Sequence, residues 1–78
     1  MPIAFVCITT GPASTVEVVQ KVRAIEGVEE ATVTYGIYDV VAKVKGDTLS
    51  KLKEIITKRI RKIENVQKTF TMIAIRSE

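Results

Sequence analysis

Two similar segments decide the fold of this chain: RAIEGVEEATVT at residues 23–34 and RKIENVQKTFTM at residues 61–72. When they are aligned, Arg, Ile, Glu and Val coincide at four of twelve positions. Gly27 of the first copy faces Asn65 of the second. These two residue types best tolerate the left-handed backbone conformation that ends many helices. Each copy therefore predicts the end of a helix that runs into a strand.

Amphipathic stretches precede both copies and predict the two helices. Asn65 ends the second helix, which Asp47 or Thr48 caps at its start. The first helix starts near Pro12 or Ser14, and the spacing of Ser14 and Glu17 fits a capping box. The predicted buried stripes are Val18, Val19, Val22 and Ile25 in the first helix, and Leu49, Leu52, Ile56, Ile60 and Ile63 in the second.

Four segments predict strands, with a turn at Gly36 and Ile37. They are Ile3–Thr9, Glu29–Tyr35, Tyr38–Val44 and Val66–Ile75. The first is apolar on both alternating sets of side chains, which places it at the centre of its sheet. The element order is βαβ twice, and right-handed crossovers then give one four-stranded antiparallel sheet with both helices on one face. We expect residues 1–78 to form a single α+β domain with the ferredoxin-like βαββαβ arrangement.

The size of the chain and its apolar strands predict self-assembly. With 78 residues and one cysteine, the core is small and no intramolecular disulfide can support it. Helices cover only one face of the sheet, yet the first strand is apolar on both faces and the last strand has no strongly polar face. The uncovered face would expose an apolar patch. We expect a homodimer through the sheet faces.

Composition argues against several function classes. The chain has no histidine and no GxxxxGK loop, and Cys7 lies in a strand that reads as core. We therefore expect no enzyme, no metal site and no cofactor. No apolar run is long enough to span a bilayer, no signal peptide is recognised, and a single cysteine fits a reducing compartment, so we expect a cytoplasmic protein. The basic residues between Lys51 and Lys62 read as the solvated side of the second helix.

A few polar residues stand out beside the core pattern. Asp39 is a carboxylate at the head of an apolar strand, and Thr69 and Thr71 lie in the last strand. Taken singly, Asp39 is explained by hydrogen bonds to a turn and the threonines by strand propensity. Taken together, they allow a second interpretation as a ligand site, in which the carboxylate of Asp39 binds a cationic group and the hydroxyls of Thr69 and Thr71 contribute further hydrogen-bonding groups.

The stretch from Val33 to Ile75 resembles the effector-binding domain, also called the RAM domain, of the Lrp/AsnC family of feast/famine transcription regulators. Three features carry the resemblance, which extends over essentially the whole chain. They are the Gly-x-Tyr-Asp-hydrophobic turn at 36–40, the Gly-Asp helix start at 46–47, and the Val-x-x-Thr-x-Thr strand at 66–71.

The resemblance implies an amino-acid effector. Domains of this family are ferredoxin-like, dimerise through their sheets and assemble into higher oligomers, with small effectors bound at contacts between dimers. By this resemblance, Gly36, Tyr38 and Asp39 form the turn that holds the amino group of the ligand. Thr69 and Thr71 supply hydroxyls to its polar backbone atoms.

Full-length regulators of this family carry an N-terminal helix-turn-helix domain, whereas the first strand here begins at residue 3. We therefore expect a stand-alone effector domain with no direct DNA binding, which acts by hetero-assembly with a full-length relative or simply binds an amino acid. Two alternatives stay open: an ACT-like amino-acid-binding module, and an assembly protein without a ligand.

Overall fold

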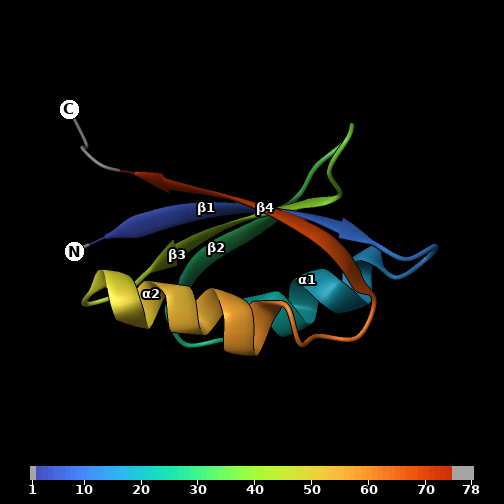
Figure 1. The fold of residues 1–78 in the computed structure, drawn as a ribbon. Coiled ribbons are helices and arrows are strands. Elements are labelled where there is room, and N and C mark those ends of the chain that lie inside the picture. The colour runs from blue at the N-terminus through green and yellow to red at the C-terminus, as the bar shows by residue number, and fades with distance from the viewer. Residues whose placement is uncertain (1, 75–78) are drawn as a thin grey trace.

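The computed structural model describes residues 2–74, and within them it shows the predicted α+β arrangement (Figure 1). The elements are β1 (Ile3–Thr10), α1 (Thr15–Arg23), β2 (Val28–Val33), β3 (Val40–Lys45), α2 (Leu49–Ile55), the π-helical turn η1 (Ile56–Ile60) and β4 (Val66–Ala74). The four strands form one antiparallel sheet in the order β2-β3-β1-β4. The ferredoxin-like fold is therefore confirmed, and β1 is central as predicted.

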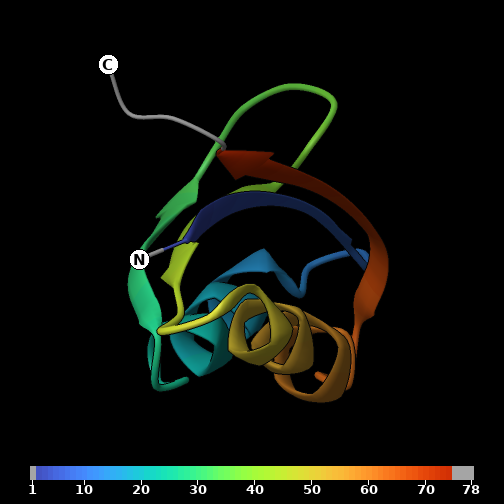
Figure 2. The ribbon, with the colours of Figure 1, turned by 60° about the vertical axis from the view of Figure 1, so that its left-hand side comes forward.

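Both helices lie beneath the same face of the sheet (Figures 1 and 2). Alternation along β1 directs Ala4, Val6 and Ile8 toward them, and each of these side chains is fully buried. Their partners in β3 continue this layer, since Ile8 pairs with Val40 and Val6 with Ala42. Residues directly opposite each other on paired strands point to the same face. The core is therefore one layer between the sheet and the helices.

Both helices end earlier than predicted, because α1 stops at Arg23 and η1 at Ile60, and a short turn then leads to Gly27 and Asn65. Gly27 has a φ of +100° and Asn65 a φ of +75°, so both residues adopt positive φ just before a strand. Val18, Val19 and Val22 of α1 are buried. The predicted capping box at Ser14 is wrong. Ser14 has a ψ of 1° instead of the extended value of a capping residue, and its Oγ donates to the carbonyl of Pro12 at 3.2 Å.

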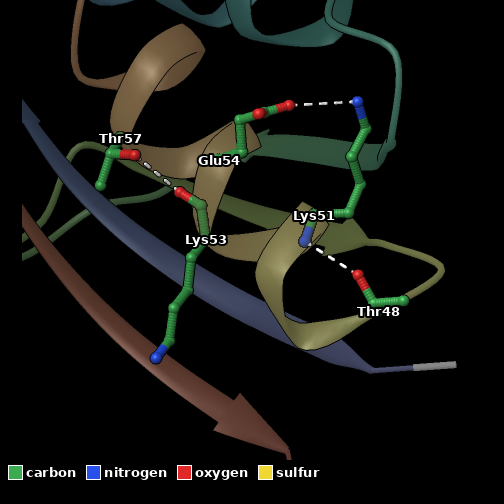
Figure 3. Close-up of polar contacts among 5 residues, drawn as sticks. All are labelled: Thr48, Lys51, Lys53, Glu54 and Thr57. Atoms are coloured by element: carbon green, nitrogen blue, oxygen red, sulfur yellow. Dashed lines mark hydrogen bonds and ion pairs between the residues drawn. The ribbon is translucent and has the colours of Figure 1, made fainter.

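Thr48, one of the two predicted caps, begins α2 (Figure 3). Its backbone is extended, and its Oγ1 accepts a hydrogen bond from the amide of Lys51 at 3.0 Å. The helix widens at its end, where the amide of Arg61 donates to the carbonyl of Ile56, five residues earlier. The predicted stripe is partly wrong. Leu49, in the first turn of α2, is exposed, and Ile55, which is outside the predicted stripe, is buried next to Ile56 where the π-helical turn begins.

The connection between β2 and β3 is longer than the predicted two-residue turn. β2 ends at Val33 and β3 begins at Val40, so the predicted strands extended too far toward each other. Thr34 closes the base of this hairpin, because its amide donates to the carbonyl of Asp39 at 2.9 Å and its Oγ1 donates to the carbonyl of Tyr38 at 2.7 Å. The hairpin rises on the side of the sheet away from the helices (Figure 1). The predicted end of the last strand, Ile75, lies outside the described residues.

Candidate ligand-binding site

Asp39 is held in place by the end of the central strand. Its amide donates to the carbonyl of Ile8 at 2.9 Å, and its Oδ2 accepts a hydrogen bond from the amide of Thr10 at 2.8 Å. The hydroxyl of Thr10 lies 3.4 Å from the same oxygen and 2.9 Å from the hydroxyl of Thr15 at the start of α1. The carboxylate therefore ties the hairpin to β1 and lies half-buried at the rim of the sheet.

The other two predicted turn residues have different surroundings. Gly36 has a φ of +148°, and a Cβ placed on it would have no neighbour within 4 Å. Its role is therefore conformational, since this backbone region favours glycine. Tyr38 is half-buried, and its ring stacks on Phe70 of β4 with the ring centres 6.4 Å apart. Gly36, Tyr38 and Asp39 thus belong to one hairpin, and Tyr38 joins it to the sheet surface.

Thr69 and Thr71 flank Phe70 in β4, but their side chains lie on the opposite face of the sheet from this stacking contact. They pair with Ile8 and Val6 of β1, whose side chains are buried under the helices, so both threonines point to the helix-covered side of an edge strand. Asp39 precedes β3, which lies on the far side of β1. Two strand spacings, about 10 Å, separate the backbones. Within residues 2–74, no hydrogen bond joins Asp39 to either threonine.

Thr69 lines a shallow hollow of about 400 Å³ at the start of β4. Its other lining residues are Arg61, Val66, Gln67 and Lys68. The lining of the hollow includes two cations and no carboxylate, which makes it suited to an anionic group. Sequence reasoning missed Arg61, because its place in a basic cluster of the second helix indicated only a solvated side chain.

A larger cleft of about 510 Å³ lies at the opposite end of the sheet from the hairpin, between the start of β2 and α2. Four of its seven charged side chains pair with one another. Lys45 lies 3.7 Å from Glu29, and Lys51 lies 3.2 Å from Glu54. Lys51 is the main cause that lowers the pKa of Glu54 below its ordinary value, through a hydrogen bond and charge attraction. Groups that already satisfy one another leave less attraction for a charged ligand.

The uncovered face of the sheet is apolar over β1 and β4. Cys7 pairs with Phe70 and Phe5 with Met72, so these side chains form two adjacent rows on that face. Phe5, Phe70 and Met72 are each between about a third and a half exposed. Toward β2 the surface becomes charged, with Lys43 lying 3.7 Å from Glu29. We refer to Phe5, Cys7, Phe70 and Met72 as the open-face patch.

Other chemistry is sparse in the part of the chain that the structure describes. Among residues 2–74, no three His, Cys, Asp or Glu side chains are grouped so that they could hold a metal ion. None of the helices described there has the length and apolar character to cross a membrane.

Comparisons with known proteins identify the family of this chain. The model of the Lrp/AsnC ligand binding domain matches residues 3–78. An HTH-type transcriptional regulator of Pyrococcus furiosus is 31% identical over 74 residues, which cover 91% of this chain and 49% of that protein. The chain thus spans about half the length of this curated relative.

Two solved structures extend the comparison. A hypothetical protein from Pyrococcus horikoshii superposes with a TM-score of 0.91 at 44% identity, covering 99% of this chain and 93% of that chain. AsnC of E. coli superposes with a TM-score of 0.89 at 25% identity, and the match covers 97% of this chain and 52% of AsnC.

Proposed function

Because this chain belongs to the Lrp/AsnC ligand-binding domain family, we propose that it is a non-enzymatic regulatory domain whose effector is a free amino acid. The family favours this reading over an ACT-like module. Its curated relative is a transcriptional regulator, which supports a role in transcription regulation. We place that role in the cytoplasm, with the regulators that the chain resembles, and assign it to ligand binding and assembly without direct DNA contact.

The position of the Asp39 carboxylate carries the proposal. The amide of Thr10 fixes one of its oxygens, so the group is oriented before any ligand arrives. An ionised carboxylate offers about four acceptor positions, and one backbone hydrogen bond leaves room for an ammonium group. Charge-assisted hydrogen bonds of this kind are stronger than neutral ones. Asp39 is therefore suited to the amino end of the effector, with Gly36 and Tyr38 shaping the hairpin around it.

The hollow beside Thr69 suits the other end of the same ligand. Its hydroxyl and the cations of Arg61 and Lys68 complement a carboxylate. The ammonium and carboxylate of an α-amino acid are joined through a single carbon, whereas Asp39 and Thr69 of one chain stand about two strand spacings apart. We therefore place the site between two copies, with Gly36, Tyr38 and Asp39 from one and Thr69 and Thr71 from the other.

Assembly is part of this function. The open-face patch supports a homodimer in which two sheets pack face to face, and a small domain gains stability from this burial. Contacts between dimers then provide the shared sites and a higher oligomer. The same surfaces support hetero-assembly with a full-length Lrp/AsnC regulator, by which the effector would influence transcription.

A thermal-shift screen of the twenty amino acids tests the proposal. A ligand that binds only the native state raises the melting temperature, by roughly 10–20 °C at a hundredfold excess over its dissociation constant for a domain of this size. Calorimetric titration then measures affinity and stoichiometry for each hit. If no amino acid shifts the melting temperature and none gives heat on titration, the assembly protein without a ligand becomes the better description.

A further inference from the structure

We propose that the tip of the β2–β3 hairpin, Tyr35 and Ile37, is an arm that packs against the second copy of this chain seated on the open-face patch. The inference rests on the proposed sheet-to-sheet dimer and adds a separate contact to it. We call these two side chains the arm tip.

The arm tip is the most exposed apolar feature among the described residues. Tyr35 is 107% exposed and Ile37 is 86% exposed, well above Phe70 of the open-face patch at 53%. The hairpin beneath them is closed by the two hydrogen bonds that Thr34 donates. These hydrogen bonds at the base of the hairpin hold both side chains in an exposed position. They also restrict the free loop, so less conformational entropy is lost when it binds. Large exposed apolar side chains on an ordered loop indicate a contact surface.

The direction of the hairpin identifies which partner it meets. It rises on the side of the sheet away from the helices, which is the side of the open-face patch (Figure 1). Tyr38, at the base of the hairpin, stacks on Phe70, a member of that patch. The arm and the patch are therefore one continuous surface. A molecule seated on the patch lies beside the arm.

The reach of the arm matches the spacing of stacked sheets. Sheets that pack face to face lie about 10 Å apart. From Thr34 to Gly36, at the turn of the hairpin, two residues of chain span at most about 7 Å, and the side chains of Tyr35 and Ile37 on either side of Gly36 add to this reach. The arm tip would thus stand level with the sheet of the facing copy and pack against its flank.

The chemistry of the arm tip suits a second copy. Residues 34–38 read Thr-Tyr-Gly-Ile-Tyr and carry no charge. In a two-fold dimer each contact occurs twice, so the hairpin of each copy would pack against the other copy. Tyrosine is among the residue types most enriched at the energetic centres of interfaces.

The double variant Tyr35→Ser/Ile37→Ser tests the arm in the full chain. Both side chains are exposed, so the isolated fold should keep its far-ultraviolet circular dichroism. Sedimentation equilibrium should show a dimer dissociation constant raised roughly tenfold, because side chains at the flank of an interface contribute less than central ones. Val16→Ser is the matched control, because Val16 is an exposed apolar residue of α1, beneath the opposite face of the sheet. An unchanged dissociation constant in the double variant would overturn the proposal.

Hydroxyl-radical footprinting of the unmodified chain gives an independent measurement. Tyr35 should react freely at concentrations where the monomer dominates and should be protected at concentrations where the dimer dominates. Protection of Phe70 without protection of Tyr35 would reject the arm and leave the sheet-to-sheet dimer standing. A chain that is monomeric at every concentration would reject that dimer and the arm together, without bearing on amino-acid binding by a single copy.

Discussion

The Oδ2 atom of Asp39 accepts a hydrogen bond from the backbone amide of Thr10 at 2.8 Å. Thr10 is the last residue of β1, two residues beyond the final pair of the β1–β3 ladder at Ile8 and Val40. A side-chain oxygen therefore continues a strand pairing after the backbone pairing has ended. This explains a charged residue at the head of an apolar strand in structural terms, and it leaves the remaining acceptor positions of the carboxylate for a ligand.

Two substitutions of Asp39 separate these roles. Asp39→Asn keeps an oxygen that can accept from Thr10, so we expect a loss of less than about 1 kcal/mol in the free energy of unfolding. It removes the charge, so amino-acid affinity should fall by about 1.5–3 kcal/mol. Asp39→Ala leaves the amide of Thr10 without its partner and should cost about 1–3 kcal/mol of stability. Urea unfolding and calorimetry measure both quantities. Unchanged affinity in Asp39→Asn would assign the carboxylate to the turn alone.

Gly27 and Gly36 both have positive φ but differ in their surroundings. A Cβ on Gly27 would lie 2.7 Å from Cδ1 of Ile55 and 3.0 Å from the carbonyl oxygen of Lys45, whereas one on Gly36 would touch nothing within 4 Å. We expect Gly36→Ala to cost about 1–2 kcal/mol through the backbone alone. Gly27→Ala should cost at least about 1 kcal/mol more, because Ile55 must shift. Equal losses in urea unfolding would contradict the close packing at Gly27.

Phe70→Ser tests the open-face patch. Phe70 is half exposed in a single chain, so its loss should cost the monomer only about 0.5–1.5 kcal/mol, the scale of its stacking on Tyr38. The dimer should lose far more, because a central aromatic side chain leaves the interface. Analytical ultracentrifugation should show a dissociation constant at least about tenfold higher than for wild type, with Val16→Ser as the control. An unaffected dimer would place the interface elsewhere.

Glu54 gives a prediction on pH. Lys51 lowers the pKa of this carboxyl below its ordinary value of 4.5. A lowered pKa means that the folded state favours the ionised form. The stabilisation is therefore present above pH 4.5 and is lost as the pH falls through the pKa of the folded state. Glu54→Gln should thus be less stable than wild type at pH 7, and the difference should shrink below pH 4.5. Urea unfolding at several pH values checks this, and a constant difference would exclude the charge as its cause.

Much of the fold was predictable because its signals are local. The repeat placed positive φ at Gly27 and Asn65, and apolar spacing located the buried face of α1. The hairpin was not predictable in the same way. Tyr35 and Tyr38 have strand propensity, and the loop that replaces those strand ends is closed by contacts with Thr34.

Packing decides the remaining details of the fold and the site. The π-helical turn η1 depends on how Ile55, Ile56 and Ile60 fit against the sheet, which spacing alone does not reveal. Asp39 could be singled out by its position before an apolar strand. Its partner Thr10 lies 29 residues away and was not predictable. Arg61 joins a hollow only because β4 passes beside it.

A mixing experiment tests whether the proposed ligand site is shared between copies. Asp39→Asn chains keep the threonine half of the site, and Thr69→Val/Thr71→Val chains keep the carboxylate half. Each variant alone should bind the amino acid identified by the thermal-shift screen weakly. After both are unfolded together and refolded as a 1:1 mixture, random assembly should join two intact halves in about a quarter of the sites. Calorimetry of the mixture should then recover wild-type affinity at about one quarter of the wild-type stoichiometry.

The control for this experiment is the same mixture prepared by combining assembled variants at low temperature, where exchange of subunits is slow. It should show no recovery until exchange occurs, which a mass-tagged chain can follow. If Asp39, Thr69 and Thr71 of the same chain formed one site, every chain in the mixture would lack one half of that site. Binding would then stay weak after complete exchange. Full exchange of subunits without any recovered binding would therefore reject the shared site. Recovery of binding in step with exchange would support it, because in the mixture only a contact between two copies brings an intact carboxylate and intact hydroxyls together.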